Sequence, residues 1–141
     1  MTRFKRILCP IDFSPTSRHA LAVAADLAKS AGGALAIVHI WQPPVYGTPD
    51  APVASSVIQS LVDEADASLA DWAAGVKANG VEHVTSQIVT GVPWHEIVGL
   101  AASADLVVMG THGRTGLKHV LIGSVAEKVV RHAPCAVLVV R

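Results

Sequence analysis

The segment ILCPIDFSPTSRHALAVAADLAKSAGGALAIVHI, residues 7–40, decides the fold. Its apolar start, Ile7–Ile11, predicts a buried strand. The pair Ser14-Pro15 then predicts a helix with serine as its cap and proline in its first turn. Alanine and leucine recur on one face of that helix until a glycine pair at 32–33 ends it. A second apolar run, Ala34–Ile40, predicts the next strand, and two buried strands joined by a helix are typical of a parallel sheet.

The remaining sequence continues this alternation after a loop that contains Pro43, Pro44, Pro49 and Pro52 and is expected to lack regular structure. The further elements expected are a long amphipathic helix over 58–76, a strand at 84–89, a short helix at 94–102, a strand at 105–109, a helix at 125–132 and a strand at 136–140. Five strands separated by four helices predict one α/β domain over residues 1–141. We expect a doubly wound parallel sheet of strand order 3-2-1-4-5 with helices on both faces.

The charge balance and the lengths of the apolar runs argue against nucleic acids and membranes as partners. Eleven basic and eleven acidic residues cancel, so no net field attracts a nucleic-acid backbone or an anionic membrane. The apolar runs are far shorter than the ~18 residues of a spanning helix, and the run before Pro10 is too short for a secretory signal. Cys9 and Cys135 lie in the first and last apolar segments of the chain and are expected to be buried, reduced thiols. We expect a cytoplasmic protein with no nucleic-acid and no membrane partner.

A glycine-spaced segment, Gly110–Ser124, leads from the fourth strand into the last helix. Glycine permits positive φ and a close approach of ligand to the main chain, and N–H groups at a helix start attract anions. Ser124 either caps this helix or bonds a phosphate oxygen, and Arg114 supplies positive charge. His112 either contacts a phosphate and assists hydrolysis or packs the loop. A surface turn is the alternative, but the position after a strand favours a phosphate site.

Asp12 follows the first strand, next to the fourth strand at the expected switch point of the sheet. A carboxylate at this place can accept hydrogen bonds from two ribose hydroxyls. The alternative role for Asp12 is to cap the first helix, although Ser14 already fills that role. Val38, on the neighbouring strand, offers an apolar wall to a base.

Several familiar motifs are absent from the sequence. Gly116 is followed by Leu117 instead of the lysine that the Walker pattern requires, and no G-x-G-x-x-G follows the first strand. The acidic pair of a phosphoryl-accepting receiver domain is also missing. The histidines do not form the i, i+4 pair of a zinc helix, so no metal-binding residues are predicted, and no residue is identified as catalytic.

Taken together, the residues quoted above resemble the universal stress protein family, specifically its ATP-binding branch. That branch carries G-x2-G-x9-G followed by serine or threonine, which Gly110, Gly113, Gly123 and Ser124 match. The resemblance covers the whole chain. It implies ATP, with Mg²⁺, in a site made of Pro10, Ile11 and Val38 at the base, Asp12 at the ribose, Met109 and Gly110 beside the ribose and α-phosphate, and Gly113, Arg114, Gly123, Ser124 and Val125 at the phosphates.

The resemblance implies a nucleotide-dependent stress-response regulator with at most slow ATP hydrolysis. A weak ATPase or a nucleotidyl-transferring enzyme is the alternative, since cradled phosphates with Mg²⁺ are already partly activated. A homodimer is also expected, through the apolar edge strand 136–140, which has no lysine, proline or bulge to guard it. A twofold axis would pair this strand with its own copy. The alternative is that a loop or the preceding helix covers the edge within one chain.

Overall fold

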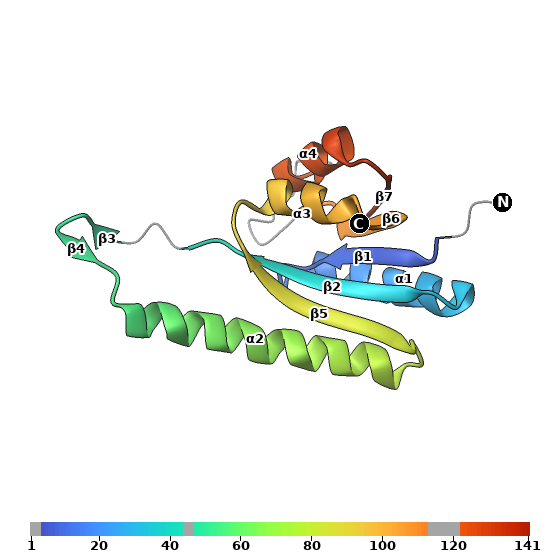
Figure 1. The fold of residues 1–141 in the computed structure, drawn as a ribbon, viewed down its shortest axis with the longest axis horizontal. Helices are drawn as coiled ribbons and strands as arrows, with labels where there is room; N and C mark the ends of the chain where they lie inside the picture. The colour runs from blue at the N-terminus through green and yellow to red at the C-terminus, as the bar shows by residue number, and fades with distance from the viewer. Residues whose placement is uncertain (1–3, 44–46, 113–121) are drawn as a thin grey trace.

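The structure is a computed structural model that describes residues 4–43, 47–112 and 122–141. Its main sheet contains five parallel strands in the order β5-β2-β1-β6-β7 (Figure 1). Their bounds are β1 Arg6–Pro10, β2 Ala34–Trp41, β5 His83–Thr90, β6 Leu106–Gly110 and β7 Ala136–Val140. Numbered among these five strands alone, the order is 3-2-1-4-5. The predicted fold class is therefore confirmed.

Helices cover both faces of the sheet, as Figure 1 shows. The helices α1, Pro15–Ala31, and α2, Ser55–Ala78, pack on one face, and α3, Pro93–Ala101, and α4, Ser124–His132, pack on the other. No helix in the part of the chain that the structure describes is long and apolar enough to cross a membrane.

The side chains of β2 alternate between two cores. Leu35 and Ile37 belong to the core beneath α1 and α2, whereas Val38 and Ile40 belong to the core beneath α3 and α4. Successive side chains of a strand point to opposite faces, so an unbroken aliphatic run is required where both faces are covered. This requirement explains why the central strands are mainly apolar, whereas the edge strand β5, which is more exposed, carries several polar residues.

The first helix begins and ends as the sequence predicts. Ser14 is its N-cap, and the Ser14 hydroxyl accepts a hydrogen bond from the backbone N–H of Ser17 at 3.1 Å. Pro15 occupies the first helical position. Gly32 ends the helix in the left-handed conformation, with φ of 61°, which glycine adopts without a Cβ penalty.

The expectation that the proline-rich loop lacks regular structure was wrong for part of it. Two short antiparallel strands, β3 Gly47–Thr48 and β4 Ala51–Pro52, form a ribbon at the far end of α2 (Figure 1). The hydroxyl of Thr48 accepts a hydrogen bond from the N–H of Ala51 at 3.1 Å and closes the turn. A ladder this short tolerates a proline, because neither strand has a second neighbour that would need the missing N–H.

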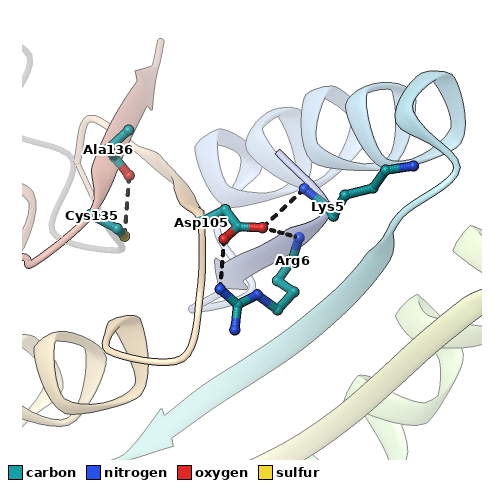
Figure 2. Close-up of polar contacts among 5 residues, drawn as sticks. All are labelled: Lys5, Arg6, Asp105, Cys135 and Ala136. Atoms are coloured by element: carbon teal, nitrogen blue, oxygen red, sulfur yellow. Dashed lines mark hydrogen bonds and ion pairs between the residues drawn. The ribbon is translucent and has the colours of Figure 1, made fainter. Parts of the chain in front are cut away.

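Asp105 joins the starts of β1 and β6, as Figure 2 shows. Its carboxylate accepts hydrogen bonds from the backbone N–H groups of Lys5 and Arg6, at 3.1 and 2.8 Å, and from the Arg6 guanidinium at 2.8 Å. The backbone N–H of Asp105 in turn donates to the Arg6 carbonyl at 2.8 Å. These hydrogen bonds hold the first residues of β1 and β6 side by side. The opposite ends of the same two strands form the candidate site.

Candidate functional site

A cleft of about 850 Å³ opens where β1 and β6 end, on the face of the sheet that α3 and α4 cover. The two strands are neighbours, but β1 continues into α1 on one face and β6 leads toward α4 on the other. This is the switch point of a doubly wound sheet, where such folds bind their ligands. The cleft is the candidate site.

Most of the residues predicted from the sequence line this cleft. They are Pro10, Ile11, Asp12, Met109, Gly110, Gly123, Ser124 and Val125. Gly113 and Arg114 lie outside the described residues. Val38 is fully buried and does not line the cleft. Ile40, two residues further along the same face of β2, lines it instead, because Val38 is paired with Pro10, the last residue of β1, whereas Ile40 lies beyond the end of β1.

Other lining residues were not predicted. They are Ser17, Ile40, Gln42, Pro93, Ile97, Thr111, Ile122, Ala126 and Glu127. Gln42 and Pro93 follow the ends of β2 and β5, and the carboxyl ends of parallel strands share one edge of the sheet, so the topology was a usable signal for both. Ile97 comes from the buried side of α3, and only the packing of that helix identifies it.

The loop after β1 is held by local hydrogen bonds between residues close in sequence. The Asp12 carboxylate accepts from the backbone N–H of Ser14 at 3.0 Å, and the backbone N–H of Asp12 meets the Ser17 hydroxyl at 3.4 Å. Ser14, not Asp12, caps α1, so Asp12 supports the cap residue while it also lines the cleft. A carboxylate accepts about four hydrogen bonds. Asp12 can therefore support the loop and bind a ligand at the same time.

The helix α4 begins at the cleft with Gly123 as its N-cap, in an extended conformation with φ of −73° and ψ of 165°. Ser124 is the first helical residue, and no side chain of the described residues caps the helix. The possible capping role of Ser124 is therefore not met, because a cap residue needs the extended conformation that Gly123 has taken. The N–H groups of Ser124 and Val125 have no partner within the helix itself, and both residues line the cleft.

The two described glycines of the segment serve close packing and not positive φ, contrary to the expectation for the loop. Positive φ occurs at other glycines of the described chain. A Cβ on Gly110 would lie 2.8 Å from the Cγ2 of Thr16, and one on Gly123 would lie 3.0 Å from the Thr111 carbonyl. Glycine is therefore needed here to bring β6 against α1 and the start of α4 against the end of β6.

The described lining is acidic in its charged groups. Asp12 and Glu127 contribute carboxylates, and no lysine or arginine is found among the described lining residues. Glu127 pairs with Arg131 one turn further along α4. The described residues hold no group of three histidine, cysteine or carboxylate side chains placed to bind a metal.

His112 is tied to the buried residue beside it. Its Nδ1 lies 2.9 Å from the hydroxyl of Thr111. Thr111 also links three elements, since its N–H donates to the Val140 carbonyl at 2.8 Å and its carbonyl accepts from the N–H of Gly123. His112 lines the cleft, and its ring orientation is fixed by the residue that joins β6, β7 and α4.

The fold places the chain among doubly wound α/β proteins, with a cleft at the switch point of its sheet. The profile of the Universal stress protein family matches residues 3–141. A universal stress protein of Methanocaldococcus jannaschii is 35% identical over 98% of this chain and 82% of its own length. A homologue from Coxiella burnetii is 34% identical over 97% and 96%. The chain belongs to the universal stress protein family, as the sequence resemblance predicted.

Solved structures agree with this assignment. The universal stress protein UspA from Lactobacillus plantarum superimposes with a TM-score of 0.89 at 29% identity, and the match covers 100% of both chains. A universal stress protein in complex with cAMP superimposes with a TM-score of 0.76 at 26% identity over 99% of both chains. The likeness extends over the whole α/β unit, including the strand ends that form the cleft.

Proposed function

We propose that this protein binds ATP in the cleft and acts as a nucleotide-dependent regulator of the stress response, with at most slow hydrolysis. The observation that carries the proposal is the start of α4, which opens into the cleft without a side-chain cap from the described residues. Backbone N–H groups and the helix dipole at such a terminus favour phosphate. The family relative in complex with cAMP supports an adenine nucleotide as the ligand class.

The lining divides into parts that suit the parts of a nucleotide. Ile11, Ile40 and Met109 offer apolar surface to a base, while Asp12 offers carboxylate oxygens to ribose hydroxyls. Ser124 and Val125 offer backbone N–H groups to phosphates, and the Ser124 hydroxyl adds a further donor. Arg114, outside the described residues, would add the positive charge that the described lining lacks.

Magnesium suits this chemistry as a companion of the nucleotide. The charged groups of the described lining, Asp12 and Glu127, are both carboxylates, so a triphosphate entering the cleft needs a counter-ion. Mg²⁺ binds oxygen ligands and is commonly held by one or two carboxylates together with substrate phosphates. Since Asp12 is assigned to the ribose, Glu127 is the described carboxylate that would hold it, and bound Mg²⁺ would supply positive charge at the phosphate oxygens.

A regulator is preferred over an ATPase or nucleotidyl transferase because the described residues include no group clearly placed to activate a water molecule. Hydrolysis needs a group that orients the attacking water, and His112 is the described candidate. Its Nδ1 is occupied by Thr111, and no neighbouring acid or base among the described residues forms a relay with its ring. Single-turnover hydrolysis that outpaces nucleotide release would favour the enzyme instead.

A pair of substitutions at Ser124 tests the phosphate site directly. Proline is well tolerated at the first helical position, and Gly123 already has the extended conformation that a residue before proline requires. Ser124→Pro therefore removes one N–H and the hydroxyl while α4 is kept, and Ser124→Ala removes the hydroxyl alone. Losing a charge-assisted hydrogen bond costs about 1.5–3 kcal/mol, or roughly 10- to 100-fold in affinity.

The affinity of the two Ser124 variants for ATP with Mg²⁺ is measured by calorimetry. We expect Ser124→Pro to weaken binding by that factor relative to Ser124→Ala, with the same thermal unfolding midpoint. Equal affinities for the two variants would show that the N–H of Ser124 does not meet a phosphate. A wild-type protein that binds no adenine nucleotide at millimolar concentration would refute the function itself.

The proposal includes a cytoplasmic homodimer. Cys9 and Cys135 are both free thiols, which suits a reducing compartment. The strand β7 is the last in the order of the main sheet, and an open apolar edge recruits another strand. The partner proposed is the nucleotide, and no nucleic-acid partner is proposed because the acidic and basic residues of the sequence cancel.

A further inference from the structure

We infer that His39 and Phe13 are positioning residues that hold the loop 11–14 in its ligand-binding shape. Neither side chain lines the cleft. Both lie on the opposite face of the sheet, at the margin of the core under α1 and α2. The role in binding rests on the proposed function, whereas the role in holding the loop is a property of the free protein.

His39 fixes the first residue of the loop. Its Nδ1 lies 2.8 Å from the carbonyl oxygen of Ile11. A carbonyl only accepts, so Nδ1 must carry the proton of this hydrogen bond. The N–H of Ile11 donates to the carbonyl of Val38 at 2.8 Å. Both backbone groups of Ile11 are therefore bound by two successive residues of β2, immediately before Asp12.

Phe13 fixes the turn itself. It has φ of 64° and is the non-glycine residue with positive φ in the described chain. A bulky side chain disfavours this left-handed conformation, which persists only when the surroundings over-determine it. In this protein the surroundings that hold Phe13 are the aromatic rings of His39 and Trp72. The Phe13 ring lies 4.7 Å from the His39 ring and meets the Trp72 ring edge-on at 5.3 Å.

These two anchors set the direction of Asp12. The side chain of Phe13 packs toward the α1–α2 core, while its neighbour Asp12 lines the cleft on the other side. The left-handed turn at Phe13 also brings the N–H of Ser14 to 3.0 Å from the Asp12 carboxylate. If the His39 imidazole or the Phe13 ring is removed, the turn loses the contacts that compensate for its backbone strain. The Asp12 carboxylate then loses its fixed place in the cleft.

The first experiment measures the free protein. His39→Leu removes the donor, and His39→Asn keeps one close to the position of Nδ1. His19→Leu is a matched control, because His19 makes the same kind of bond, Nδ1 to the Arg141 carbonyl at 2.6 Å, on another part of the chain. Amide hydrogen exchange at Asp12 and Ser14 should be about fivefold faster in His39→Leu, the effect of one hydrogen bond.

The same readout should stay close to wild type in His39→Asn and His19→Leu. Phe13→Leu, which keeps an apolar side chain without the ring contacts, should act in the same direction as His39→Leu. Unchanged exchange at Asp12 and Ser14 in both His39→Leu and Phe13→Leu would overturn the inference, whether or not the protein binds a nucleotide.

The second experiment separates positioning from general stability by ligand. His39→Leu should weaken ATP about fivefold but leave inorganic triphosphate unchanged, because triphosphate has no ribose for Asp12 to bind. The losses in His39→Leu and Asp12→Asn should not add in the double variant, since both act through one carboxylate. Equal weakening of ATP and triphosphate would assign His39 to stability alone. Absence of ATP binding in wild type refutes the proposed function, and exchange then decides the positioning role.

Discussion

The carboxylate of Asp105 binds Arg6 through both of its oxygens, one to the guanidinium and one to the backbone N–H, each at 2.8 Å (Figure 2). The hydrogen bond from the Arg6 side chain is the largest of the causes that lower the pKa of Asp105 below its usual value. Burial opposes the shift but does not cancel it. Asp105 is thus poised to stay ionised where it joins β1 to β6.

The lowered pKa predicts how stability depends on pH. A group with a depressed pKa in the folded state contributes stability above its unfolded pKa, near 3.9 for aspartate, and loses it as pH falls through the folded pKa. Asp105→Asn should therefore lower the urea midpoint at pH 7, and the difference from wild type should shrink below about pH 4. Asp26→Asn, on the exposed side of α1, is the control and should differ little at either pH.

The two thiols should differ in reactivity. Cys9 is fully buried in the core, and burial raises the pKa of its thiol well above the usual range. Cys135 is only partly buried, and its Sγ lies 3.4 Å from the Ala136 carbonyl (Figure 2). An aromatic disulfide reagent at pH 8 should modify Cys135 in the folded protein and reach Cys9 only in urea, since the thiolate is the nucleophile. Cys135→Ala should be unreactive when folded, and rapid modification of this variant would contradict the burial of Cys9.

The sequence predicted the sheet because its central strands β1, β2 and β6 are buried on both faces. Runs such as Ile7–Ile11 and Ala34–Ile40 need no partner information to be identified, and topology rules then restrict their order. The N-cap at Ser14 could also be predicted from neighbouring residues alone, because serine followed by proline is a common helix start. The β3–β4 ribbon was missed because prolines argue against strands in general, whereas a two-residue pair satisfies its hydrogen bonds despite Pro52.

The site was predicted where it follows from strand ends and missed where it follows from packing. Asp12 follows shortly after β1 and Gly110 is the last residue of β6, so their positions in the sequence alone predict that they lie at the site. Val38 was expected to line the cleft, yet only tertiary structure reveals that Val38 is enclosed in the core and that Ile40, also largely buried, reaches the cleft. Ser124 was expected as a possible cap, and a shift of one residue at the helix start gives that place to Gly123.

A substitution at Asp12 tests the ribose role without destroying the loop. Asp12→Asn keeps an oxygen for the N–H of Ser14 but removes the charge, while Asp12→Ala removes both. Loss of a charge-assisted bond, about 1.5–3 kcal/mol, predicts ATP binding roughly 10- to 100-fold weaker in Asp12→Asn. Inorganic triphosphate should bind with unchanged affinity. If calorimetry gives the same loss for both ligands, Asp12 does not contact the ribose.

The geometry of β7 predicts how a homodimer forms and how to prevent it. The N–H of Thr111 donates to the Val140 carbonyl, so the polar backbone groups of Val140 point toward β6. Successive residues alternate in this direction, and the N–H of Val139 therefore points toward the open edge. On this edge the side chain of Leu138 is 39% exposed, which is large for a leucine within a strand and suits burial against a second copy.

Val139→Pro should convert the dimer to a monomer without unfolding it, because proline removes a donor from the outer side of an edge strand only. Val139→Ala is the matched control. It trims the side chain but keeps the N–H, so it should remain more dimeric than Val139→Pro. Sedimentation equilibrium at micromolar concentration should give twice the chain mass for wild type and for Val139→Ala, and a lower mass for Val139→Pro. A monomeric wild type would rule out the dimer, and a Val139→Pro protein that stays dimeric would move the interface away from β7.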